Sequence, residues 1–146
     1  MLNLQKKYEL PEWAAVKKAK PPAEDPAGRD DPVAGFEKLF GLSPGQKAAI
    51  LDFDGFEILF SSAVVKESRK SMQKYYRRFS QTLLKPSEVW VEIGADNLPQ
   101  YNYIKVYEDG FFEVRVEDGE ARFFVLKDDA AWADRQRGGF LVYISL

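Results

Sequence analysis

The sequence predicts an α+β fold in which one long amphipathic helix packs on a mainly antiparallel sheet of four to five strands. Two observations lead to this class. Apolar residues recur every three to four positions from Val64 to Leu84, which is the period of a helix with one buried face. From Val89 onward, short runs of alternating polar and apolar residues are separated by turn sequences, which is typical of antiparallel strands. A small hairpin and a proline-rich arm are expected before this unit.

The arm comprises residues 1–34 and is expected to be largely flexible, whereas residues 35–146 are expected to form a single domain. Five prolines lie between Pro11 and Pro32, among charged residues and alanines that offer little apolar surface for a core. Trp13 and Val16 stand three residues apart, so that a short helix there could dock on the domain or on a partner.

The expected hairpin follows from Asp54-Gly55, which stands between the apolar runs Ala49 to Leu51 and Phe56 to Phe60. Glycine readily supplies the positive φ that a tight hairpin turn requires. After it, Ser61-Ser62 are suitable helix N-cap residues and Pro86 disfavours continuation of the helix. The long helix is therefore expected between these two signals, with Met72 and Phe79 buried.

Charge is segregated along the chain, although the net charge is only −2. Residues 61–85 hold seven cations and one anion, whereas residues 86–130 hold four cations and eleven anions. This pattern predicts an anionic partner for the basic segment. A solvated helix face paired with acidic loops would produce the same pattern, and both interpretations stay open.

Five strands are expected, beginning near Val89, Tyr101, Phe111, Ala121 and Phe140. The turn Glu108-Asp109-Gly110 joins the second strand to the third. Alternation predicts two faces for these strands. The face toward the helix is expected to hold Ile104, Val106, Phe112, Val114 and Val116, and the other face Tyr103, Lys105, Glu113, Arg115 and Tyr143.

The residue types on the polar face are suited to cutting RNA without a metal. The chain has no histidine and no cysteine, so acid–base chemistry must use carboxylates, amines, guanidinium groups or phenols. A carboxylate can take the 2′-OH proton while cations stabilise the charge that develops on phosphorus. Cross-strand Glu and Arg pairs also occur on many sheets without any chemical role.

Several short motifs carry a family resemblance. They are Leu51 to Gly55, Ile58 to Ser61, Leu84-Lys85-Pro86-Ser87-Glu88-Val89-Trp90, Tyr103-Ile104-Lys105-Val106 and Arg137 to Tyr143. Together they resemble phage-type members of the barnase, EndoU, colicin and RelE (BECR) nuclease superfamily, which occur in Mu-like phage head proteins and toxin-like effectors. The resemblance implies functional roles for Lys66, Arg69, Lys105 and Tyr143. Related sequences often have a helix histidine, and a Thr or Ser where this chain reads Phe123-Phe124-Val125.

We therefore expect a metal-independent ribonuclease of toxin, effector or phage type that cleaves RNA by 2′-OH attack. The expected catalytic residues are Lys105, Glu113, Arg115 and Tyr143, and the expected substrate-binding residues are Lys66, Arg69 and Tyr103. Neither a cofactor nor a metal is expected. The alternative is a catalytically degenerate phage structural or partner-binding module with the same fold.

The expected partners are RNA and either an immunity or antitoxin protein or phage head proteins, with no membrane association. No apolar run has the length of a membrane span, and the N-terminus lacks the apolar core of a signal peptide. The expected location is the cytoplasm, a phage virion, or a target cell into which the protein is delivered.

Overall fold

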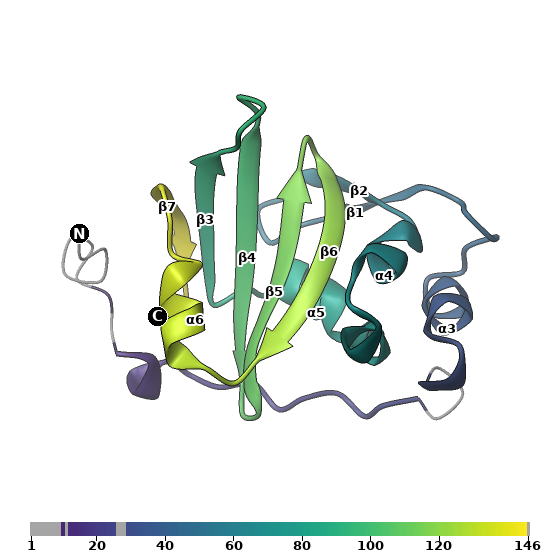
Figure 1. Cartoon of the computed structure of the whole chain (residues 1–146), viewed down its shortest axis with the longest axis horizontal. Coiled ribbons are helices and arrows are strands. Elements are labelled where there is room, and N and C mark those ends of the chain that lie inside the picture. The colour runs from purple at the N-terminus through teal and green to yellow at the C-terminus, as the bar shows by residue number, and fades with distance from the viewer. Residues whose placement is uncertain (1–9, 11, 26–28, 146) are drawn as a thin grey trace.

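A computed structural model describes residues 10, 12–25 and 29–145. It is an α+β fold built on one seven-stranded sheet with the order β1-β2-β6-β5-β4-β3-β7 (Figure 1). The strands are β1 (Ala48–Leu51), β2 (Glu57–Phe60), β3 (Glu88–Ile93), β4 (Pro99–Tyr107), β5 (Gly110–Glu117), β6 (Glu120–Lys127) and β7 (Phe140–Ile144). The α-helices are α3 (Pro32–Leu39), α4 (Ala63–Glu67), α5 (Arg78–Leu84) and α6 (Ala130–Arg135), and the 3-10 helices are η1 (Trp13–Ala15) and η2 (Lys70–Tyr75).

The expected sheet of four to five antiparallel strands is wrong in size and in type. The hairpin of β1 and β2 forms as expected, but it joins the sheet through a parallel pairing of Leu59 in β2 with Glu120 in β6. At the other edge, β7 returns to pair with β3. These two additions produce a mixed seven-stranded sheet.

The expected long helix from Val64 to Leu84 is also wrong, because the segment is divided into α4, η2 and α5. The break lies at Ser68, whose backbone is extended at φ −79° and ψ 149°. The Ser68 hydroxyl donates to the Val64 carbonyl at 2.7 Å and accepts from the Phe124 amide of β6 at 3.0 Å. Because β2 pairs with β6 only at Glu120, the side of β6 away from β5 has no described strand beside Phe124, and Ser68 satisfies the Phe124 amide there.

The main core lies between the sheet and the helices α3, α4 and α5. Phe36, Phe60 and Phe79 pack edge to face or tilted in its centre, with ring centroids 5.6 to 6.0 Å apart. Phe112 and Phe124 add a stacked pair from the sheet at 5.5 Å. We call this side of the sheet the helix face and the other side the opposite face. Met72, expected in the core, is only half-buried.

The described part of the proline-rich arm packs on the domain. Leu10 is buried against Trp90 and Ile104, and the Trp13 ring lies 5.0 Å from the Phe111 ring. Further on, the Ala19 amide donates to the Val106 carbonyl, so the arm continues the sheet beside the end of β4. Residues 1–9, 11 and 26–28, which belong to the arm expected to be flexible, lie outside the described residues.

In the described part of the chain, no helix has both the length and the apolar character needed to cross a bilayer.

Candidate active site

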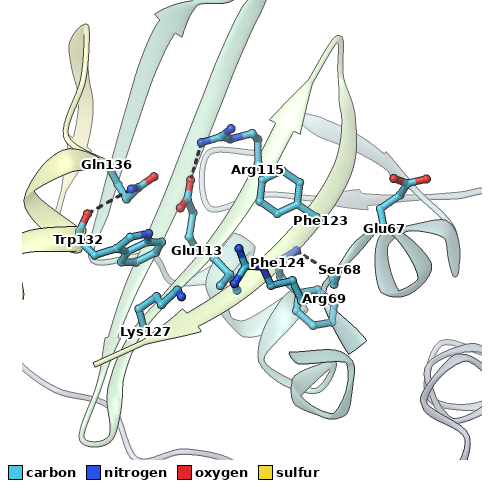
Figure 2. A pocket seen from close by; sticks show the side chains of 11 residues that line it. Glu67, Ser68, Arg69, Glu113, Arg115, Phe123, Phe124, Lys127, Trp132 and Gln136 are labelled. Atoms are coloured by element: carbon cyan, nitrogen blue, oxygen red, sulfur yellow. Dashed lines mark hydrogen bonds and ion pairs between the residues drawn. The ribbon is translucent and has the colours of Figure 1, made fainter. Parts of the chain in front are cut away.

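Glu113 forms the floor of a cavity on the opposite face of the sheet. The cavity has a volume of about 450 Å³ and lies between β5, β6, α6 and the junction of α4 with η2 (Figure 2). The Glu113 side chain is 1% exposed, although glutamate is rarely buried without a strong partner. The walls of the cavity include Arg69, Arg115, Phe123, Lys127, Trp132 and Gln136.

The turn between β4 and β5 decides which residues share a face with Glu113. Tyr107 pairs with Gly110, so the turn contains only Glu108 and Asp109, and Glu113 lies beside Ile104. The expected faces assumed that Gly110 also belonged to the turn. Since side chains alternate along a strand, this difference of one residue reverses every assignment of β5 relative to β4. The expectation that Lys105 and Arg115 lie on the same face is therefore wrong.

A β-bulge then decides which residues of β6 join Glu113. The register between β5 and β6 shifts between Arg115 and Val116, so that Arg115 pairs with Phe123. Without this shift Arg115 would pair with Arg122, and Glu113 would pair with Phe124. The bulge thus places Phe123, Val125 and Lys127 on the face of Glu113.

Glu113 is only weakly paired. Its Oε1 lies 3.4 Å from the Arg115 Nη2, and the Arg115 Nε donates to Asn102 at 3.3 Å. Asn102 in turn donates to Glu92 at 3.2 Å and to the carbonyl of Gln136 at 3.3 Å, which ties Arg115 to α6. Burial raises the pKa of Glu113 from 4.5 to about 7, against the opposing effect of the Arg115 charge. The carboxyl group can therefore exchange a proton near neutral pH.

Two further cations and two aromatic rings surround this carboxyl group. Figure 2 shows Arg69 and Lys127 reaching into the space beside Glu113 from different walls. The Arg115 guanidinium lies 5.1 Å from the centre of the Phe123 ring, and Trp132 stands at the α6 side of the cavity. Cations can bind a phosphate here, and aromatic rings can stack on bases.

The structure brings together three of the residues singled out from the sequence, namely Arg69, Glu113 and Arg115. Lys66 lies in α4 and does not line this cavity. Lys105 and Tyr143 line a second cavity on the helix face. Tyr103 is also on the helix face, where it is buried and its hydroxyl donates to Asp52 at 2.7 Å. Burial and the Asp52 carboxylate raise the Tyr103 pKa far above its usual range.

The sequence did not indicate three residues that line or support the Glu113 cavity: Asn102, Lys127 and Trp132. Asn102 was assigned to no face. Its pairing with Arg115 follows directly from a two-residue turn, Glu108-Asp109, between β4 and β5. Lys127 joins the site through the bulge, which leaves no clear signal in the sequence. Trp132 belongs to the short helix α6, to which the sequence patterns assigned no part in the site.

The described residues contain no group of three or more carboxylate side chains close enough to hold a metal ion together. The arrangement around Glu113 offers instead one titratable carboxyl group, two guanidinium groups and one ammonium group. Chemically, this set can accept a proton and stabilise an anionic oxygen.

Residues 35–144 match the family model described as phage-Barnase-EndoU-ColicinE5/D-RelE like nuclease2. No curated protein matches the chain, and no solved structure matches it.

Proposed function

The chain belongs to the phage-Barnase-EndoU-ColicinE5/D-RelE like nuclease2 family, and on that premise we propose that it is a metal-independent ribonuclease whose site is the cavity around Glu113. The observation that carries the proposal is the buried Glu113 carboxyl group, with a pKa of about 7, at the floor of a cavity walled by cations. A general base is most effective when its pKa lies near the working pH.

In the proposed reaction the Glu113 carboxylate takes the proton from a ribose 2′-OH. The 2′ oxygen then bonds to phosphorus, and the bond from phosphorus to the 5′ oxygen of the next nucleotide breaks. This leaves a 2′,3′-cyclic phosphate. Arg115 and Arg69 stabilise the negative charge on the phosphoryl oxygens, and the leaving 5′ oxygen needs a proton, which the Lys127 ammonium group can supply.

The site geometry also favours single-stranded RNA as substrate. A scissile phosphate beside Glu113 has the Phe123 ring on one side and the Trp132 ring on the other. Bases flanking the phosphate can stack on these rings only when they are not paired in a duplex.

The test is an incubation of the purified chain with single-stranded RNA and with the same sequence in 2′-deoxy form, each with and without EDTA. We expect the RNA to be cut equally well in EDTA, with fragments ending in 2′,3′-cyclic phosphate, and the deoxy strand to stay intact because it lacks the nucleophile. Cutting of the deoxy strand or loss of cutting in EDTA would contradict the proposal. Intact RNA throughout would favour the alternative of a catalytically degenerate phage structural or partner-binding module.

A further inference from the structure

A second cavity, on the helix face, gathers four lysines. Lys17 and Lys18 come from the arm, Lys85 follows the end of α5, and Lys105 comes from β4. The cavity has a volume of about 590 Å³. None of the four lysines forms a salt bridge with any described residue, and Asp54 is the one described carboxylate in the wall.

Lys105 and Lys85 are held close together, and no described carboxylate forms a salt bridge with either of them. The Lys105 Nζ donates to the Lys85 backbone carbonyl at 2.6 Å, which fixes the ammonium group at the C-terminal end of α5. Burial, and then the charge of Lys85, lower the pKa of Lys105. Two ammonium groups that repel each other in a partly enclosed space are stabilised by an anion that contacts both.

An aromatic surface lies in the same cavity. The rings of Tyr143 and Phe53 are 4.3 Å apart at an interplanar angle of 36°, and Phe53 also contacts the buried Tyr103 ring at 6.4 Å. Both residues line the cavity with the lysines. Tyr143 belongs to β7, which pairs with β3, so its backbone is held by the sheet. A fixed aromatic ring beside unpaired cations is the combination that binds a base together with its phosphate.

From this juxtaposition we infer that the second cavity binds one nucleotide of a single-stranded nucleic acid, with its phosphate between Lys85 and Lys105 and its base on Tyr143. Taking RNA as the natural ligand rests on the proposed function. The second cavity and the Glu113 cavity lie on different faces of the sheet, so the second cavity anchors a strand away from the scissile phosphate. It therefore contributes to the binding of long substrates and not of dinucleotides.

The experiment measures binding of a fluorescent single-stranded deoxyoligonucleotide, which has no 2′-OH and cannot be cleaved by the proposed reaction. Wild type is compared with Lys85→Ala/Lys105→Ala and with the control Lys38→Ala/Lys47→Ala, which changes the net charge equally but lies outside both cavities. We expect the first variant to bind about tenfold more weakly, and its slope of log affinity against log salt to be smaller by about one, as loss of one or two phosphate contacts requires. The control should change the affinity less than twofold.

Tyr143 supplies an independent arm of the test. Tyr143→Leu keeps the lysines and most of the apolar volume but removes the aromatic ring. We expect the affinity to fall about fivefold or more, because about fivefold is the lower end of the effect of removing a ring that stacks on a base. Tyr143→Phe should restore binding. Lys85→Glu, at an exposed position without a side-chain partner among the described residues, replaces the double variant if Lys105→Ala impairs folding. Affinities of the double variant or Lys85→Glu that equal the control, or of Tyr143→Leu that equal wild type, would overturn the inference.

Cleavage assays separate this inference from the proposed function. With an RNA dinucleotide, the lysine double variant should cut as fast as wild type, whereas a 20-nucleotide RNA should show a raised KM. If wild type cuts neither RNA, the proposed function fails while the deoxyoligonucleotide still reports on the second cavity. If wild type cuts both and the lysine variant binds as tightly as its control, only the inference about the second cavity fails.

Discussion

Two buried glutamates on the opposite face of the sheet invite comparison. Glu88 in β3 and Glu113 in β5 both pair with Ile104 of β4, one from each side, and both side chains are 1% exposed. Glu88 accepts from the Arg137 Nε at 2.8 Å and Nη2 at 2.6 Å, and from the Trp90 indole at 2.9 Å. Among the described residues, the one hydrogen-bond partner of the Glu113 carboxyl group is the Arg115 Nη2 at 3.4 Å.

The number and accessibility of donors separate the two roles. Arg137 is itself buried, and the Trp13 ring covers it at 3.6 Å, so its ion pair with Glu88 is closed to solvent and satisfied. Arg115 keeps about a quarter of its side chain exposed and faces the cavity. A buried carboxylate with three donors stabilises structure, whereas one with a single long contact remains available for proton transfer.

The largest effect that sharpens this contrast is the loss of cleavage in Glu113→Gln. The amide cannot accept the 2′-OH proton, so we expect single-turnover cleavage to fall by about 10² to 10⁴-fold, the usual contribution of a general base. Binding of single-stranded RNA should be retained. Glu57→Gln at an exposed position of β2 is the matched control and should cleave like wild type. Full activity of Glu113→Gln would remove this residue from the mechanism.

The second effect concerns stability. Glu88→Gln leaves the buried Arg137 without its close, two-point carboxylate partner and with only Asp134, 3.7 Å from its Nη1, as a described counter-charge, so we expect the free energy of unfolding to fall by about 3 kcal/mol. Urea unfolding at neutral pH measures this loss. Replacing both partners, as Glu88→Leu with Arg137→Met, should recover much of it because no unpaired charge is then buried. If Glu88→Gln were as stable as wild type, the claim that Glu88 has a structural role and Glu113 does not would be contradicted.

The third effect is a pH dependence of stability that comes from Glu113. Its pKa is about 7 in the folded chain and near 4.5 when unfolded, so the unfolded state releases the proton first as the pH rises. Stability should therefore fall between about pH 4.5 and 7, by up to about 3 kcal/mol from this group. Glu113→Gln should lack that decline and be more stable than wild type at pH 8. The difference between the two unfolding profiles isolates Glu113, and parallel profiles would contradict its raised pKa.

The smallest effect concerns Asn102, which connects Arg115 to α6. In Asn102→Ala the guanidinium loses its 3.3 Å contact, so we expect kcat/KM for RNA to fall about tenfold, or about 1.4 kcal/mol. Gln100→Ala is the control on the same strand, because Gln100 donates to Glu92 at 3.4 Å, whereas the described hydrogen bonds of Arg115 go to Asn102 and Glu113. Equal kcat/KM values for the two variants would show that Asn102 does not position Arg115.

The sequence by itself determined the strand segments, the Asp54-Gly55 hairpin, and the presence of a carboxylate and cations on the same strand. These features follow from local alternation and turn chemistry, which act over a few residues. They were sufficient to place Glu113 and Arg115 two residues apart on one face of β5, because that relation depends only on the period of a strand.

Only the tertiary structure decided which residues from other strands join Glu113. A turn of two residues after Tyr107 moved Lys105 to the helix face, and the bulge after Arg115 brought Lys127 to the site. The break of the helix at Ser68, where no described strand pairs with β6 on the side away from β5, placed Arg69 at the cavity wall. Register and helix breaks depend on hydrogen bonds between distant segments, and since side chains alternate with a period of two, a shift of one residue exchanges the faces.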